Sequence, residues 1–123
     1  MKTFHKKISR KKVYKEYVNI LNGNLQLSFR EADVFAVLLQ LNDEWHNMIM
    51  ATNNILSTDV RRELMRETRI KKINLARYIK GLASKGILLQ TEKGGYMLNE
   101  MFIPDIQEST CEIMFILTMQ DGK

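Results

Sequence analysis

The chain has 123 residues and a formal net charge of +5 at pH 7, with 19 lysines and arginines against 14 aspartates and glutamates. This length suits one domain, and no apolar run approaches the roughly 20 residues that a membrane-spanning helix needs. The single cysteine cannot form an internal disulfide. The cysteine and the two histidines lie far apart in the sequence and do not have the spacing of metal ligands, so we expect no metal and no cofactor.

Positive charge is concentrated in two parts of the chain. Residues 1–15 hold seven basic residues and no acidic one, and residues 60–85 hold nine basic residues against two acidic ones. From Asn99 onward, five acidic residues face only Lys123. This separation favours a protein with one surface adapted to an anion such as nucleic acid, and a solvated basic surface is the alternative.

Residues 1–11 form a basic arm that lacks apolar periodicity, and we expect this arm to be flexible in isolation. Such an arm can bind phosphates or enter a minor groove, and the candidate contacts are Arg10 and Lys11 at its end and Lys12 directly after it. A tail that only keeps the protein soluble is the alternative. Residues 12–123 are expected to form the single folded domain.

Two helices are predicted in the first third of the chain. The first covers residues 12–21 and is expected to stop at Gly23, which suits a left-handed cap. The second begins at the capping box of Ser28 and Glu31 and runs to about Leu41. Its core face consists of apolar residues at helical spacing: Ala32, Phe35, Leu38 and Leu39, broadened by Val34 and Val37.

Residues 42–54 have no clean period and are predicted to form a short helix or a loop that contains a strand. Trp45 lies in this stretch, and for a tryptophan packing against the core is a commoner role than stacking on a base. Residues 53–58 are expected to form a short first strand and then the N-cap of the next helix, with Ser57 or Thr58 as the capping residue.

Residues 59–85 have the pattern of a helix-turn-helix. A short amphipathic helix covers residues 59–67, and a second helix begins near Ile73 and stops before Gly86. Ile70 is expected to fill the turn between the two helices. The core stripe of the second helix is formed by three residues at spacings of four and seven: Leu75, Ile79 and Leu82.

The other faces of this second helix carry basic and polar side chains. The N-terminal half of such a helix can reach base edges in a major groove, since arginine pairs with guanine and asparagine with adenine. The candidates for DNA contact are Lys71, Lys72, Asn74 and Arg77, followed by Tyr78 and Lys80. An ordinary amphipathic helix in a basic protein is the alternative interpretation.

Residues 87–91 and 96–99 have strand composition and are joined through Gly94 and Gly95, which predicts a β-hairpin. After a helix-turn-helix, such a hairpin is typical of a wing. Lys93 lies at the expected tip, and we include it as a candidate phosphate contact.

The stretch from Cys111 to Met119 is apolar on both faces and fits a buried strand or a short helix. Together with the helix from Val13 to Leu21 it is the predicted contact of a homodimer, because both are more apolar than a minimal winged helix requires. The alternative is that the two segments pack on each other and complete the core of a monomer.

The stretch from Arg62 to Leu88, together with residues 95–99, resembles the winged helix-turn-helix proteins of the replication-initiator and regulator type found in plasmids and phages. Thr68 and Arg69 depart from that family, which usually has an aliphatic residue and often a glycine at these positions. These departures predict a turn that is longer or less tight than usual. The resemblance implies DNA binding through the candidates on the second helix.

The expected fold is mainly α-helical with a small β-hairpin: a winged helix-turn-helix with its core at residues 59–85, its wing at 87–99, an extra N-terminal helix and a C-terminal apolar segment. The expected function is binding of double-stranded DNA, as a phage- or plasmid-type transcriptional regulator or replication-associated factor in the cytoplasm of a bacterial or phage-infected cell. The alternative is a winged-helix module for protein interaction or assembly. Since no glycine-rich phosphate loop or catalytic triad can be placed, an enzyme is not expected.

Overall fold

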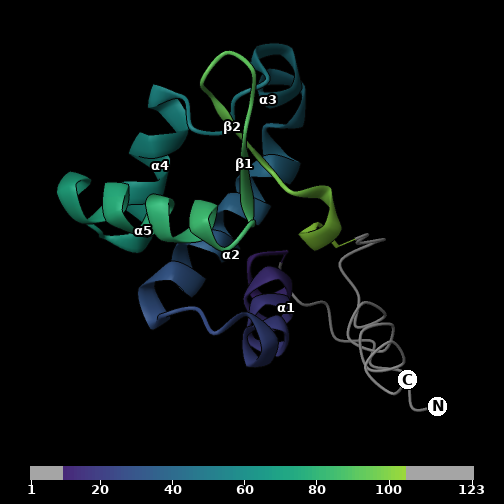
Figure 1. The fold of residues 1–123 in the computed structure, drawn as a ribbon, viewed down its shortest axis with the longest axis vertical. Coiled ribbons are helices and arrows are strands. Elements are labelled where there is room, and N and C mark those ends of the chain that lie inside the picture. Colours follow the sequence, from purple (N-terminus) through teal and green to yellow (C-terminus); the bar gives the residue numbers. More distant parts are fainter. Residues whose placement is uncertain (1–9, 105–123) are drawn as a thin grey trace.

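The structure is a computed structural model that describes residues 10–104; at Arg10 it describes the backbone only. This part of the chain is mainly helical, with five α-helices followed by a two-stranded antiparallel hairpin and a 3₁₀ helix (Figure 1). The elements are α1 (Arg10–Leu25), α2 (Phe29–Glu44), α3 (His46–Thr52), α4 (Thr58–Thr68), α5 (Lys72–Ser84), β1 (Leu88–Gln90), β2 (Tyr96–Leu98) and η1 (Glu100–Phe102). None of the described helices has the length and hydropathy needed to cross a membrane.

The core is built around α2, which contacts α1, α3, α4 and α5. Its apolar residues recur at helical spacing, so that Val34, Phe35 and Leu38 are fully buried. These residues were predicted as the core face, and the prediction is confirmed. Because α2 is covered on several sides, it holds α4 and α5 in place relative to each other.

The N-terminus of α2 is fixed by the predicted capping box. The backbone N–H of Glu31 donates to the Ser28 hydroxyl at 3.2 Å, and the backbone N–H of Ser28 donates to Glu31 Oε1 at 2.9 Å. Glu31 Oε1 also accepts from Lys85 Nζ at 2.8 Å. A Cβ at Gly81 would lie 1.8 Å from Glu31 Oε2, so glycine leaves the room that this carboxylate occupies. One side chain therefore joins the start of α2 to the end of α5.

We predict that Glu31→Gln costs about 1 kcal/mol of stability at neutral pH and much less in acid. Burial raises the pKa of Glu31, but the hydrogen bonds from Lys85 and Ser28 outweigh burial and hold the pKa below its ordinary value of 4.5. A lowered folded-state pKa means that the stabilisation is complete above the unfolded-state pKa. It is lost as the pH falls through the folded-state pKa. Urea unfolding at neutral pH and near pH 3 measures this loss.

The matched control is Glu16→Gln, because Glu16 is exposed on α1. It should change stability little at either pH. A deficit of Glu31→Gln that is the same size at both pH values would contradict the role given to the ionised carboxylate.

The helix α1 is longer than predicted at both ends. It begins at Arg10 and continues through Gly23 to Leu25, so the predicted stop at Gly23 is wrong. The left-handed residue is Gln26, with φ 54°. The side chain of Asn22 accepts the backbone N–H of Leu27 at 2.6 Å. The backbone N–H of Gln26 donates to the Asn22 carbonyl at 3.0 Å, so α1 ends with a left-handed residue as expected, but three residues later than Gly23 and at a glutamine.

The apolar face of α1 packs inside the domain. Val13, Tyr14 and Val18 are buried, and the hydroxyl of Tyr17 donates to the carbonyl oxygen of Phe102 at 2.8 Å. Burial raises the pKa of Tyr17 to about 12. The other half of the predicted dimer contact, from Cys111 to Met119, lies outside the described residues, so the dimer stays a prediction.

For residues 42–54 the sequence allowed a short helix or a strand-containing loop. The structure has helix there up to Thr52, because α2 extends to Glu44 and α3 covers His46–Thr52. The predicted first strand near residue 55 is wrong. A single backbone hydrogen bond joins this segment to β2, in which the Ile55 N–H donates to the Tyr96 carbonyl at 2.7 Å. The Asn54 side chain accepts the Tyr96 N–H at 3.1 Å, in place of a backbone carbonyl. Ser57 caps α4, as one of the two predicted candidates.

The predicted hairpin is confirmed. Gly86 ends the helical region with φ 78°, a conformation that costs little only for glycine. β1 and β2 then pair with Leu88 opposite Leu98, and both of these leucines are buried. Figure 1 shows the turn of the hairpin beside α3, at the far end from its junction with α5.

Candidate nucleic-acid interface

The turn between α4 and α5 is short, with three residues, 69–71, between the last residue of α4 and the first of α5. Thr68 Oγ1 donates to the Leu64 carbonyl at 2.6 Å and accepts the Ile70 N–H at 3.3 Å. Arg30 from α2 donates to the Thr68 carbonyl at 2.9 Å. The prediction of a longer or less tight turn is therefore wrong, because Thr68 supplies local hydrogen bonds that an aliphatic residue cannot make.

Arg69 occupies the left-handed position of this turn, with φ 59° and ψ 26°. Its backbone N–H donates to the Met65 carbonyl at 2.8 Å and closes the end of α4. The conformation explains why glycine is expected here, since a Cβ carries a steric cost in this region. The arginine side chain itself is exposed.

We predict that Arg69→Gly is more stable than Arg69→Ala by about 1 kcal/mol. Both variants lose the same charge, but only glycine relieves the left-handed strain. Chemical denaturation of the two variants, followed through the single Trp45, measures the difference. Equal stability of the two variants would contradict the assignment of strain to this residue.

The helix α5 presents one face to the core and an opposite face outward. The predicted core residues Leu75, Ile79 and Leu82 are buried, as is Ile70 in the turn. The outward stripe runs at spacings of four, three and four along the helix. It consists of the exposed residues Ile73, Arg77, Lys80 and Ser84. We call this set the outward stripe of α5.

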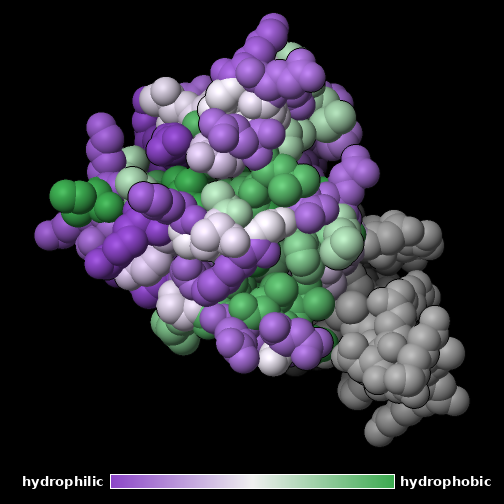
Figure 2. All heavy atoms as spheres, viewed as in Figure 1, coloured by the Kyte–Doolittle hydropathy of each residue, from purple (hydrophilic) through white to green (hydrophobic). Residues whose placement is uncertain are grey.

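Four of the predicted DNA contacts are exposed on the turn and on α5. Lys71 is the N-cap of α5 and Lys72 its first residue, and both are exposed. Arg77 and Lys80 belong to the outward stripe. Figure 2 shows hydrophilic side chains over most of the left edge of the molecule, the side on which Figure 1 places α4 and α5.

Two further candidates, Asn74 and Tyr78, lie on one flank of α5 and are half-buried. Asn74 Oδ1 accepts from Arg77 Nη2 at 3.3 Å. The guanidinium of Arg77 lies 5.4 Å from the centre of the Tyr78 ring. Both residues therefore contact the Arg77 side chain and restrict its movement.

The remaining candidates are not part of this group. Lys11 on α1 forms an ion pair with Glu67 at 2.9 Å, which neutralises part of its charge. Lys12 is exposed on the same helix, and the side chain of Arg10 is not described. Lys93 is exposed in the hairpin turn, and that turn lies toward α3 rather than toward α5 (Figure 1).

The electrostatic contrast between α4 and α5 is sharp. Residues 68–91 contain six basic residues and no acidic one. On α4, in contrast, Arg62 pairs with Asp59 at 3.5 Å and Arg66 pairs with Glu63 and Glu67. Among the described residues, the cations of the turn and of α5 that form no ion pair are Arg69, Lys71, Lys72, Arg77 and Lys80. Lys85, the remaining basic residue of the segment 68–91, forms an ion pair with Glu31.

Sequence reasoning missed two exposed residues of this surface. Arg69 was treated only as a departure from a family pattern, and Ile73 only as the start of a helix. Ile73 is 81% exposed. Its spacing of four and seven residues from Arg77 and Lys80 was the available signal, because this spacing places all three on one helical face.

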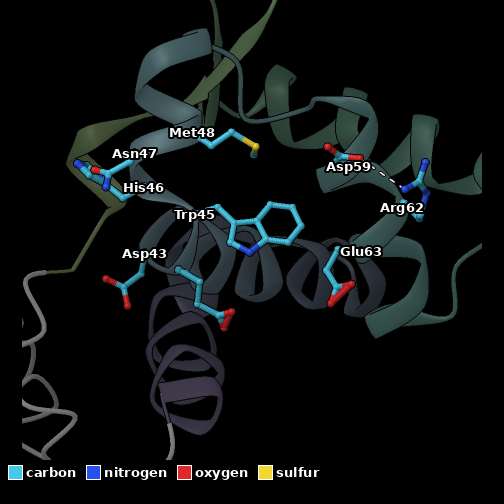
Figure 3. A pocket seen from close by; sticks show the side chains of 9 residues that line it. Asp43, Trp45, His46, Asn47, Met48, Asp59, Arg62 and Glu63 are labelled. Atoms are coloured by element: carbon cyan, nitrogen blue, oxygen red, sulfur yellow. Dashed lines mark hydrogen bonds and ion pairs between the residues drawn. The ribbon is translucent and has the colours of Figure 1, made fainter.

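A separate cleft of about 610 Å³ lies between the end of α2, α3 and α4. In Figure 3 the ring of Trp45 lies in the middle of this cleft, with Met48 on one side and Glu63 on the other. Asp43, Glu44 and Asp59 also line it. Trp45 is partly buried and packs against the core, as expected for the commoner of its two roles. The carboxylates make this cleft unfavourable for phosphate.

Comparison of the chain with family models, with curated proteins and with solved structures found no match.

Proposed function

We propose that this chain binds double-stranded DNA as a winged helix-turn-helix, with α4 and α5 as the two helices of the motif and the β1–β2 hairpin as its wing. In this proposal α5 lies in the major groove with its outward stripe toward the bases. The observation that carries the proposal is the set of unpaired cations on an acid-free turn and helix. Phosphates are bound best by cations that no carboxylate already neutralises.

The position of each cation suits a distinct contact. Lys71 and Lys72 lie at the N-terminus of α5, where the helix dipole adds to their attraction for a phosphate. Arg77 is held by Asn74 and Tyr78, so it loses less side-chain freedom on binding a phosphate or a guanine edge. Lys80 extends the same stripe by one turn.

A DNA-binding role of this kind fits a transcriptional regulator or a replication-associated factor of phage or plasmid type that works in the cytoplasm. A protein partner with an acidic surface is the competing interpretation of the same cations. The two differ in charge density, because DNA releases condensed counterions on binding and a folded acidic protein does not.

The test is to measure the Kd of the wild-type protein for duplex DNA between about 50 and 200 mM salt. If four of the cations engage phosphates, a plot of log K against log salt should have a slope near about −4. A folded acidic protein serves as the comparison ligand and should bind with a much shallower slope. Absence of salt-dependent duplex binding would refute the proposal.

A further inference from the structure

Ile73 is the most exposed of the large apolar side chains in the described part of the chain, at 81%. It lies in the first turn of α5, on the outward stripe, and it precedes Arg77 by four residues and Lys80 by seven. With a rise of about 1.5 Å per residue, these cations follow it at about 6 and 10 Å along the same face. An apolar group thus stands at one end of a row of unpaired cations.

No role within the domain accounts for this isoleucine. The contacts of α5 with the core are made by Leu75, Ile79 and Leu82, on the opposite face. Isoleucine is also not favoured by the helix itself, because its β-branched side chain loses rotamer freedom there. Phe29 is nearly as exposed, but the arginine next to it, Arg30, is paired with Asp33 at 3.0 Å.

The chemistry of the major groove supplies a partner for such a group. Thymine is the one base that presents a methyl group there, and apolar side chains recognise it by contact. The first residues of a groove-binding helix are those that reach base edges. A stiff β-branched side chain loses little further freedom when it packs against a methyl group.

We propose that Ile73 is a specificity-determining residue that contacts the 5-methyl group of thymine, so that α5 prefers a thymine at one position of its site. This inference rests on the proposed DNA binding. Arg77 and Lys80 provide affinity and hold the helix in the groove. Ile73 provides the preference for thymine through an uncharged, apolar contact.

The experiment begins with duplexes selected by the wild-type protein from a random pool. Each thymine is then replaced in turn by deoxyuridine, which lacks only the methyl group, and Kd is measured by fluorescence anisotropy. Loss of one buried methyl group corresponds to about 0.8 kcal/mol, so we expect Kd to rise about fourfold at one or two thymines. Ile73→Ala should bind the thymine duplex more weakly by a similar factor and should no longer respond to deoxyuridine at those positions.

The two changes form a double-mutant cycle, and the inference requires their effects to be non-additive. Ile73→Val, which keeps a β-branched side chain, should retain the response to deoxyuridine. Phe29→Ala, which removes an equally exposed apolar group from α2, should leave the response unchanged. All variants should keep the wild-type unfolding temperature, because the residues are exposed.

Failure of this inference can be told apart from failure of the proposed function. Steep salt-dependent binding with additive effects, or without any thymine that responds to deoxyuridine, would overturn the role of Ile73 and leave DNA binding in place. Absence of salt-dependent binding by the wild-type protein would overturn both.

Discussion

Replacing Lys72, Arg77 and Lys80 together with alanine is expected to raise the Kd for duplex DNA on the order of 100-fold. Each of these side chains is exposed, and none of them has a carboxylate partner among the described residues. At about 1 kcal/mol for each contact, three contacts amount to about two factors of ten. The slope of log K against log salt should become shallower by roughly three, since each phosphate contact contributes about one.

The matched control replaces Lys15, Arg62 and Arg66 with alanine. Both triple variants lower the formal net charge of +5 by the same three units. The control, however, removes cations from α1 and from a helix where Arg62 and Arg66 already pair with carboxylates. We expect it to bind DNA within a few-fold of wild type. Equal weakening by the two variants would mean that net charge, rather than the α5 surface, attracts DNA.

The largest loss of stability is expected from Phe35→Ala, at about 3–5 kcal/mol. The Phe35 side chain is fully buried in α2, the helix that contacts α1, α3, α4 and α5. Its removal loses apolar burial and leaves a cavity that the surrounding helices cannot close. For a domain of this size such a loss is comparable with the whole stability, so the variant is expected to be partly unfolded at 25 °C.

The chain provides its own control in Phe29, six residues earlier on the same helix. Phe29 is 78% exposed, so Phe29→Ala should change stability by no more than about 0.5 kcal/mol. Urea unfolding followed by the fluorescence of Trp45, the single tryptophan, compares the two variants directly. Similar losses in both would contradict the placement of the core on the Phe35 side of α2.

Local features of the chain were predictable because the partners of each interaction lie close together in the sequence. The capping box joins Ser28 to a residue three positions away, and hydrogen bonding at this distance does not depend on the rest of the fold. The core stripe of α5 follows from helical periodicity alone. The stop at Gly86 follows from the backbone freedom of glycine.

Predictions were wrong where a side chain took over a backbone role. The expected strand before α4 failed because the Asn54 side chain binds the N–H of Tyr96, 42 residues later. The expected stop at Gly23 failed because α1 runs on to Leu25 and ends at the left-handed Gln26, after which the Asn22 side chain accepts the backbone N–H of Leu27. The asparagine side chain competes with backbone carbonyls for backbone N–H groups. Neither secondary-structure propensity nor hydrophobic periodicity predicts this competition.

The sequence by itself determined the helical class, the hairpin, the core faces of α2 and α5, and the excess of positive charge at residues 68–91, because these depend on composition and on short-range spacing. The tertiary structure decided which charges remain available. Lys11 and Lys85 are paired with Glu67 and Glu31, both more than 50 residues away in the chain. Ion pairs and exposure between distant segments depend on how the helices are placed around α2, and no local pattern contains that information.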